Sequence, residues 1–389
     1  MTDTRAWLAE TLDAGRIGAM QHATCAMLDA AAAEGRLLII GSAALPMRIM
    51  RAVRQGGGRV AAMVEYAPRF WGRDAEGVPV LPLDEALALT GPDPVVLVGI
   101  WSPQHVHGHT VAWLTTRGIT RILPVMAAFW RWAGALGEHY QLSGPEPLLA
   151  AASRIMAVHD RLADAQSRRH YAADLAWRLA FDHASLPEPR PEAIYFDRAL
   201  LRLPEDAVVV DGGAFSGDAL EHFLRWHGPR FGRYHAFEPD PISFAKLTQY
   251  RDRLPPAVAA RIALHQAGIG ATAGELRLDP SGTPGTITGG SGSVVVPCVT
   301  LDAVLGAQRV DCIKLDTEGQ EHPVLDGAAG IIARDQPALA ISVYHKPDDI
   351  VTLPERAIAA LPDAALHVRS HDHDGIDLVL TAVPRRFQP

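Results

Sequence analysis

VVVDGGAFSGD, residues 208–218, joins a run of valines to a glycine-rich turn and then to an acidic residue. A short apolar run followed by such a turn is typical of a buried parallel strand that leads into a helix. The glycines let a ligand approach the backbone closely, and the start of the helix favours negative charge on that ligand. A dinucleotide site would use much the same parts, so this stretch alone leaves the ligand open.

A second predicted strand ends in an acid. Residues 232–240 are GRYHAFEPD, in which Glu238 follows the apolar part. In a doubly wound sheet the carboxyl end of this strand lies beside the first loop, where a carboxylate can bind both hydroxyls of a ribose. Because Glu238 would repel a 2′-phosphate, the candidates are ligands with a free ribose, and both S-adenosylmethionine and NAD qualify.

The alternation of strands and helices continues to the end of the chain. Apolar runs at residues 262–266, 311–316 and 339–343 predict further strands. The last two runs, 366–369 and 378–382, are expected to form an antiparallel hairpin at the sheet edge. This pattern predicts an α/β fold, in which ligands bind at the carboxyl ends of the strands.

Three titratable residues follow two of these strands and are predicted to be catalytic. Asp316 and Glu318 lie in the turn after one strand, and His345 lies after the next. His345 is the first choice of general base because imidazole titrates near neutral pH. Asp316 is the second choice of general base. Otherwise its carboxylate binds a hydroxyl group of the substrate or the amino-acid end of a cofactor. No metal is assigned, although the two carboxylates together could bind Mg²⁺ or Ca²⁺.

An ordered set of motifs resembles the FkbM family of S-adenosylmethionine-dependent methyltransferases. After Tyr195 and Phe196, the set comprises VVDGGAFSGD, HAFEPDP, VTLDAVL, CIKLDTEGQEHPVLDGA, PALAISVYHKPDDIVTLPERAI and DLVLTAV. The resemblance implies a Rossmann-like sheet of seven strands, six parallel and one antiparallel. It also implies methyl transfer to a hydroxyl of a sugar, polysaccharide precursor or small secondary metabolite. Thr317 and the run from Ser370 to Asp374 depart from the family pattern, which leaves the acceptor open.

Motifs and resemblance together predict the residues that bind S-adenosylmethionine. They are the residues of the two loops and of two later strand ends: Asp211, Gly212, Gly213, Ala214, Ser216, Gly217, Asp218, Glu238, Pro239, Gln266 and Asp316.

The N-terminal half is predicted to form a smaller α/β domain. We divide the chain into a helical arm (1–35), a Rossmann-like domain (36–140), a helical connector with a proline-rich linker (141–192) and a methyltransferase domain (193–389). The N-terminal domain lacks GxGxxG, and we expect it to help bind the acceptor or to mediate dimerisation.

Two local features of this domain can also be predicted. Ser102 is expected to cap a helix that begins at Pro103, since serine and proline favour these two positions. The histidines at 105, 107 and 109 are expected to face solvent.

Composition excludes several classes of protein. The chain has 389 residues and a net charge of −8, which disfavours binding to nucleic acid. Its three separated cysteines form no disulfide pattern, and no apolar stretch is long enough to span a membrane. We therefore expect a cytoplasmic enzyme that acts on a small-molecule or saccharide acceptor. A homodimer is compatible with the sequence. The alternatives are an NAD-dependent oxidoreductase and a non-catalytic protein that binds a nucleotide or S-adenosylmethionine.

Overall fold

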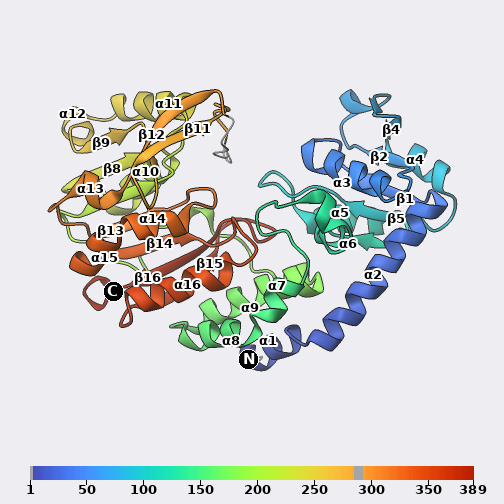
Figure 1. The fold of residues 1–389 in the computed structure, drawn as a ribbon, viewed down its shortest axis with the longest axis horizontal. Coiled ribbons are helices and arrows are strands. Elements are labelled where there is room, and N and C mark those ends of the chain that lie inside the picture. The colour runs from blue at the N-terminus through green and yellow to red at the C-terminus, as the bar shows by residue number, and fades with distance from the viewer. Residues whose placement is uncertain (1–2, 284–291) are drawn as a thin grey trace.

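The computed structural model describes residues 3–283 and 292–389. Two α/β lobes stand side by side on a base of helices (Figure 1). We call them the N-terminal lobe, the C-terminal lobe and the helical base. Both lobes contain sheets dominated by parallel strands, so the predicted α/β class is confirmed.

The N-terminal lobe is built on a six-stranded sheet of order β3-β4-β2-β1-β5-β6. Its strands are β1 (Leu37–Ile40), β2 (Ala62–Val64), β3 (Asp74–Ala75), β4 (Val78–Leu81), β5 (Val95–Val98) and β6 (Ile122–Leu123). Its helices are α2 (Ala14–Glu34), α3 (Ala44–Gln55), α4 (Leu83–Thr90), α5 (His107–Thr115) and α6 (Met126–Leu136). All adjacent strands pair in parallel except β3 and β4, two short strands that the sequence pattern did not predict.

Two predictions for this lobe were wrong. Helix α5 begins at His107 and not at Pro103, because Ser102 closes a turn in which it accepts from the backbone N–H of Gln104. His107 is buried and His105 nearly so, since both lie where this helix meets the rest of the protein. The prediction of solvent-facing side chains is therefore wrong for His105 and His107, whereas His109 is exposed as predicted.

The helical base joins both ends of the N-terminal half to the C-terminal lobe. It contains α1 (Thr4–Thr11), α7 (Glu146–Ala150), α8 (Ala152–Arg161) and α9 (Ala165–Ala180). Leu8 of α1 and Leu175 of α9 belong to the same hydrophobic core as Ile341 of the C-terminal sheet. The base therefore packs on that sheet as one layer.

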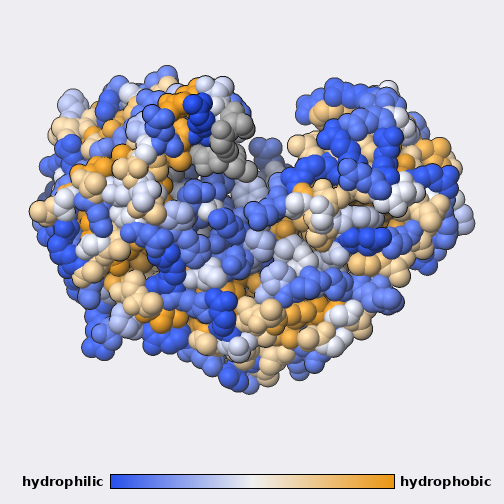
Figure 2. Space-filling model, viewed as in Figure 1, coloured by the Kyte–Doolittle hydropathy of each residue, from blue (hydrophilic) through white to orange (hydrophobic). Residues whose placement is uncertain are grey.

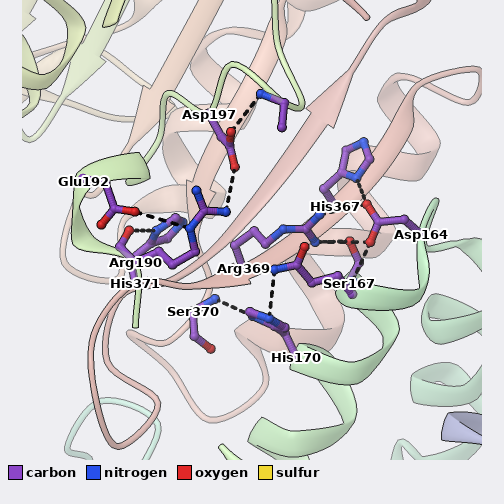
Figure 3. A network of polar contacts seen from close by, with 12 residues as sticks. Asp164, Ser167, His170, Arg190, Glu192, Asp197, His367, Arg369, Ser370 and His371 are labelled. Atoms are coloured by element: carbon purple, nitrogen blue, oxygen red, sulfur yellow. Dashed lines mark hydrogen bonds and ion pairs between the residues drawn. The ribbon is translucent and has the colours of Figure 1, made fainter. Parts of the chain in front are cut away.

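A polar network fixes α9 to the C-terminal lobe (Figure 3). Asp164 caps α9 by accepting from the N–H of Ser167, and it also accepts from His367 and Arg369, each at 2.8 Å. Burial opposes ionisation, but the Arg369 and Ser167 hydrogen bonds hold the pKa of Asp164 below its usual range. His170 accepts from the backbone N–H of Ser370.

The C-terminal lobe contains a seven-stranded sheet of order β15-β16-β14-β13-β7-β8-β9. These strands are β7 (Val208–Gly212), β8 (Arg233–Phe237), β9 (Ile262–His265), β13 (Cys312–Leu315), β14 (Ala338–Ser342), β15 (Ala365–Ser370) and β16 (Leu378–Val383). Strand β16 runs antiparallel to both of its neighbours, and the other adjacent pairs are parallel. Strand order reverses at β7, and the crevice at such a switch point is where open α/β sheets bind ligands.

Helices and a small second sheet complete this lobe. The helices are α10 (Asp218–His227), α11 (Pro241–Asp252), α12 (Pro256–Ala259), α13 (Leu301–Leu305), α14 (Glu321–Gly327), α15 (Ala329–Asp335) and α16 (Asp349–Ala360). The small sheet consists of β10 (Gly268–Ile269), β12 (Val294–Val299) and β11 (Gly274–Leu278). Single 3-10 turns are η1 (Pro68–Phe70), η2 (His183–Ser185), η3 (Pro191–Ala193) and η4 (Arg385–Phe387).

Within residues 3–283 and 292–389, no helix combines the length and apolar character that crossing a bilayer requires.

Candidate functional site

A cavity opens at the carboxyl ends of β7, β8 and β13, at the switch point of the C-terminal sheet. Its walls come from the loops after these strands and from the small sheet. The lining residues are Gly213, Phe215, Asp218, Phe237, Glu238, Pro239, Ser243, Ala267, Gly268, Ile269, Leu276, Thr283, Asp316, Thr317, Glu318 and Gln320. The predicted residues that line it are therefore Gly213, Asp218, Glu238, Pro239, Asp316 and Glu318.

Gly213 brings two of these loops into contact. Its φ of 74° lies in the left-handed region, and a Cβ built there would meet the backbone oxygen of Asp316 at 1.9 Å. Only glycine therefore allows the loop after β7 to lie directly against the turn after β13.

Glu238 is held in place by the backbone. One carboxylate oxygen accepts from the N–H of Phe215 and the other from the N–H of Asp240, both at 2.8 Å. Burial raises the pKa of Glu238 to about 7, against the effect of these two hydrogen bonds. Each oxygen retains further acceptor capacity, so a pair of hydroxyl groups could still bind to this carboxylate.

The charged side chains among the described lining residues are all acidic. Four of the lining residues are acids, namely Asp218, Glu238, Asp316 and Glu318. Among the lining residues that the structure describes there is neither lysine nor arginine. Such a cavity attracts a cationic ligand and repels an anionic one.

Two donors converge on the carboxylate of Asp316. Its carboxylate accepts from the Tyr195 hydroxyl at 2.8 Å, and the Nε2 atom of His345 lies 3.2 Å from its other oxygen. Although burial opposes ionisation, His345 and the charge of Lys314 hold the pKa of Asp316 far below its usual range. The side chain is still 26% exposed, so an ionised oxygen is accessible from the cavity.

His345 occupies a position unsuited to its predicted role as general base. It is 5% exposed, does not line the cavity, and has Nδ1 2.8 Å from Glu321 and Nε2 beside Asp316. Burial opposes its charge, but the two carboxylates raise the pKa of His345 well above its usual value. An imidazolium has no lone pair with which to accept a proton, and both ring nitrogens of His345 already face carboxylates.

Asp211 lies beneath the cavity rather than in its wall. It is fully buried, and its carboxylate binds Lys314 at 3.0 Å and the Tyr234 hydroxyl at 2.8 Å. Lys314 also donates to the backbone oxygen of Gly213 at 2.7 Å. The pair therefore supports the glycine loop from below.

The remaining predicted residues surround the cavity without lining it. Gly212 is the last residue of β7, and Ala214, Ser216 and Gly217 belong to the same loop as Gly213. Gln266 is exposed, and the three residues that follow it line the cavity instead. Gln266 lies outside the cavity because β9 ends at His265, and the residues that follow Gln266 lead into β10.

Several site residues were missed by sequence reasoning. Tyr195 was noted as part of a motif but given no role, and Glu321 follows the Asp-Thr-Glu-Gly turn by two residues. The distance of Tyr195 from Asp316 along the chain gives no local signal. Glu321 could have been found, since the first turn of α14 places an acid close to the preceding loop.

Some residues of this site have a strained backbone. Positive φ angles at residues other than glycine occur in Tyr140, Tyr195, Phe215, Glu318 and Asp377, among others. Such conformations cost about 1–3 kcal/mol each and persist where the surrounding structure over-determines them. The strained residues include the partner of Asp316 and two residues of the cavity wall.

Comparison with known proteins found one matching family model and solved structures to which the chain is similar. Residues 211–380 match the family model described as the methyltransferase FkbM domain. A search of curated proteins found no match. The crystal structure of methyltransferase FkbM from Methylobacillus flagellatus KT superposes with a TM-score of 0.80 at 23% identity, covering 98% of this chain and 99% of that one. The fold of both lobes is therefore shared with that protein.

Two further structures are much less similar. A putative rRNA-methylase from Clostridium thermocellum gives a TM-score of 0.33 at 9% identity, covering 51% of this chain and 99% of that one. Fibrillarin from Aeropyrum pernix, solved with natively bound S-adenosyl-L-methionine, gives 0.25 at 19% identity, covering 46% and 69%. The family-model match identifies residues 211–380 as similar to the methyltransferase FkbM domain, and the full-length superposition shows a shared fold.

Proposed function

We propose that the protein is an S-adenosylmethionine-dependent methyltransferase that acts on a hydroxyl group of a sugar, a polysaccharide precursor or a small metabolite. The observation that carries the cofactor assignment is the lining of the cavity, with four acids and, among its described residues, no lysine or arginine. S-adenosylmethionine carries a sulfonium and an ammonium group, whereas NAD carries a pyrophosphate. The charge of the cavity favours the former and opposes the latter.

The residues present fit this cofactor. Glu238 offers two buried carboxylate oxygens to a ribose diol, and Phe237, Pro239 and Ile269 supply apolar wall for a base. Asp218 or Asp316 could hold the ammonium group. When bound, S-adenosylmethionine supplies a methyl group already activated for transfer.

The chain's own task is to position the acceptor and receive its proton. Holding an acceptor in line with the methyl group can contribute roughly 7–11 kcal/mol, and a proton acceptor about 10²–10⁴-fold in rate. We assign the proton to Glu318, whose side chain is 25% exposed. Asp316, which is 26% exposed and has its pKa held far below the usual range, accepts a hydrogen bond from the acceptor hydroxyl and orients it, and His345 fixes Asp316 in that position.

Calorimetric titration with S-adenosylhomocysteine and, separately, with NAD⁺ tests the cofactor assignment. We expect binding of S-adenosylhomocysteine and none of NAD⁺. Binding of NAD⁺ alone would replace the proposal with an oxidoreductase.

Methyl transfer itself is tested with tritiated S-adenosylmethionine and the glycan and metabolite fractions of host cells. We expect label in an O-methyl group with the wild type and not with Asp316→Asn. Equal labelling by the two proteins would refute the role of Asp316.

A further inference from the structure

The N-terminal lobe reaches the rim of the methyltransferase site with a set of aromatic side chains. Trp101 follows β5, and His139 and Tyr140 follow α6. The ring of Trp101 lies 5.2 Å from that of Tyr140 and 6.4 Å from that of Tyr344 in the C-terminal lobe. Tyr140 in turn lies 6.0 Å from His345, the partner of Asp316. We call Trp101, His139, Tyr140 and Tyr344 the aromatic wall.

The aromatic wall is anchored at both ends. The backbone oxygen of Asp374 accepts from the indole N–H of Trp101 at 3.1 Å and of Trp177 at 3.0 Å. The Tyr344 hydroxyl donates to Asp377 at 3.0 Å. The Trp101 contact joins the two lobes, and the Tyr344 contact fixes the orientation of that ring within the C-terminal lobe.

Tyr140 connects the wall to the catalytic carboxylates. Its φ of 51° is strained for a tyrosine, which shows that its surroundings determine its position. Burial, the charge of Glu318 and a hydrogen bond to Glu318 raise the pKa of Tyr140. Its hydroxyl is therefore protonated at neutral pH and directed at the carboxylate pair from the other lobe.

Both aromatic side chains that the N-terminal lobe brings to this contact keep part of their surface accessible. Figure 2 shows a hollow between the two lobes, and Trp101 and Tyr140 are both partly exposed. Aromatic faces pack against the C–H face of a ring, while carboxylates accept hydrogen bonds from hydroxyl groups and repel anions. The combination selects an uncharged ring that carries several hydroxyl groups.

We propose that the aromatic wall is the acceptor subsite, in which Trp101 and Tyr140 of the N-terminal lobe hold an uncharged, polyhydroxylated ring against Asp316 and Glu318. The subsite rests on the proposed methyl transfer and adds to it the part played by the N-terminal lobe. It also excludes acceptors with a phosphate or carboxylate on the methylated ring.

Ligand-observed saturation-transfer NMR on the protein loaded with S-adenosylhomocysteine tests this subsite. The neutral probes are methyl glycosides and cyclitols, and the anionic probes are glucuronic acid and glucose 6-phosphate. We expect signal from neutral probes only, falling at least tenfold in Trp101→Ala and in Tyr140→Ala. Trp71→Ala, an exposed tryptophan of the same lobe, is the matched control and should keep the full signal.

Conservative variants separate binding from folding. Trp101→Phe and Tyr140→Phe keep the aromatic faces and should retain most of the signal even if the alanine variants unfold. Signal that is unchanged in all four variants, signal from the anionic probes, or no signal from any neutral probe would overturn the subsite. Calorimetry keeps this result distinct from the cofactor assignment: the phenylalanine variants should bind S-adenosylhomocysteine within twofold of wild type, and only failure of the wild type to bind it counts against the proposed function.

Discussion

Replacing Glu238 with alanine is the sharpest test of how the cavity binds its cofactor. The two oxygens of this carboxylate each accept one backbone N–H and retain room for a further hydrogen bond. If a ribose diol binds there, Glu238→Ala removes two hydrogen bonds to a charged acceptor.

The size of the effect follows from these bonds. A hydrogen bond to a charged group contributes about 1.5–3 kcal/mol, so two contribute roughly 3–6 kcal/mol. At about 1.4 kcal/mol per factor of ten, the affinity for S-adenosylhomocysteine should fall by about 10²–10⁴-fold. The variant also leaves the N–H groups of Phe215 and Asp240 without this acceptor, so some loss of stability is expected as well.

Calorimetric titration at pH 8, where most of Glu238 is ionised, measures the affinity, and thermal unfolding reports whether the variant is folded. Glu205→Ala serves as the control, because Glu205 is exposed and pairs only at the surface with Arg230. A folded Glu238→Ala variant whose dissociation constant rises less than threefold would refute the assignment of this carboxylate to the ribose.

Three further outcomes are expected. Burial raises the pKa of Glu238 to about 7, and binding a diol favours its ionised form. The affinity for S-adenosylhomocysteine should therefore weaken as pH falls from 8 to 6. Calorimetry that finds no pH dependence would contradict this. His345→Asn should lower the free energy of unfolding by about 3–5 kcal/mol, because it leaves the buried carboxylate of Glu321 without its cation and removes the charged partner of Asp316. Since the folded pKa of His345 is raised, this difference should be largest near pH 6 and shrink as pH rises, and urea denaturation that shows the opposite trend would refute the charge assignment. Gly213→Ala should destabilise the fold by more than about 1 kcal/mol and abolish binding, since its Cβ would collide with the backbone of Asp316; unchanged urea midpoints would contradict the close approach.

The acidic residues at the carboxyl ends of the strands were the part of the site that the sequence predicted best. Glu238 and Asp316 each follow an apolar run, and parallel strands bring their carboxyl ends to one edge, so both were expected at the cavity and both line it. Asp211 obeys the same local pattern but is buried. Its neighbour across the strand pair is Lys314, and that register is a property of the sheet that the pattern of one strand does not contain.

The surroundings of His345 could not be predicted from the usual pKa of a histidine. Its protonation depends on Glu321 at one ring nitrogen and Asp316 at the other, which meet only after α14 and the loop after β14 have packed. The start of α5 was mispredicted because the serine and proline at 102–103 are equally suited to a turn.

The contact between Tyr140 and Glu318 was the feature least accessible from the sequence. It requires a left-handed backbone at a tyrosine and the arrangement of two lobes whose strands are far apart in the chain.

A crystal structure of the protein with S-adenosylhomocysteine tests the central claim most directly. We predict that the nucleoside occupies the cavity at the switch point of the C-terminal sheet, with both ribose hydroxyls on Glu238 and the sulfur facing Asp316. An empty cavity at saturating ligand, or a nucleoside bound elsewhere, would contradict it.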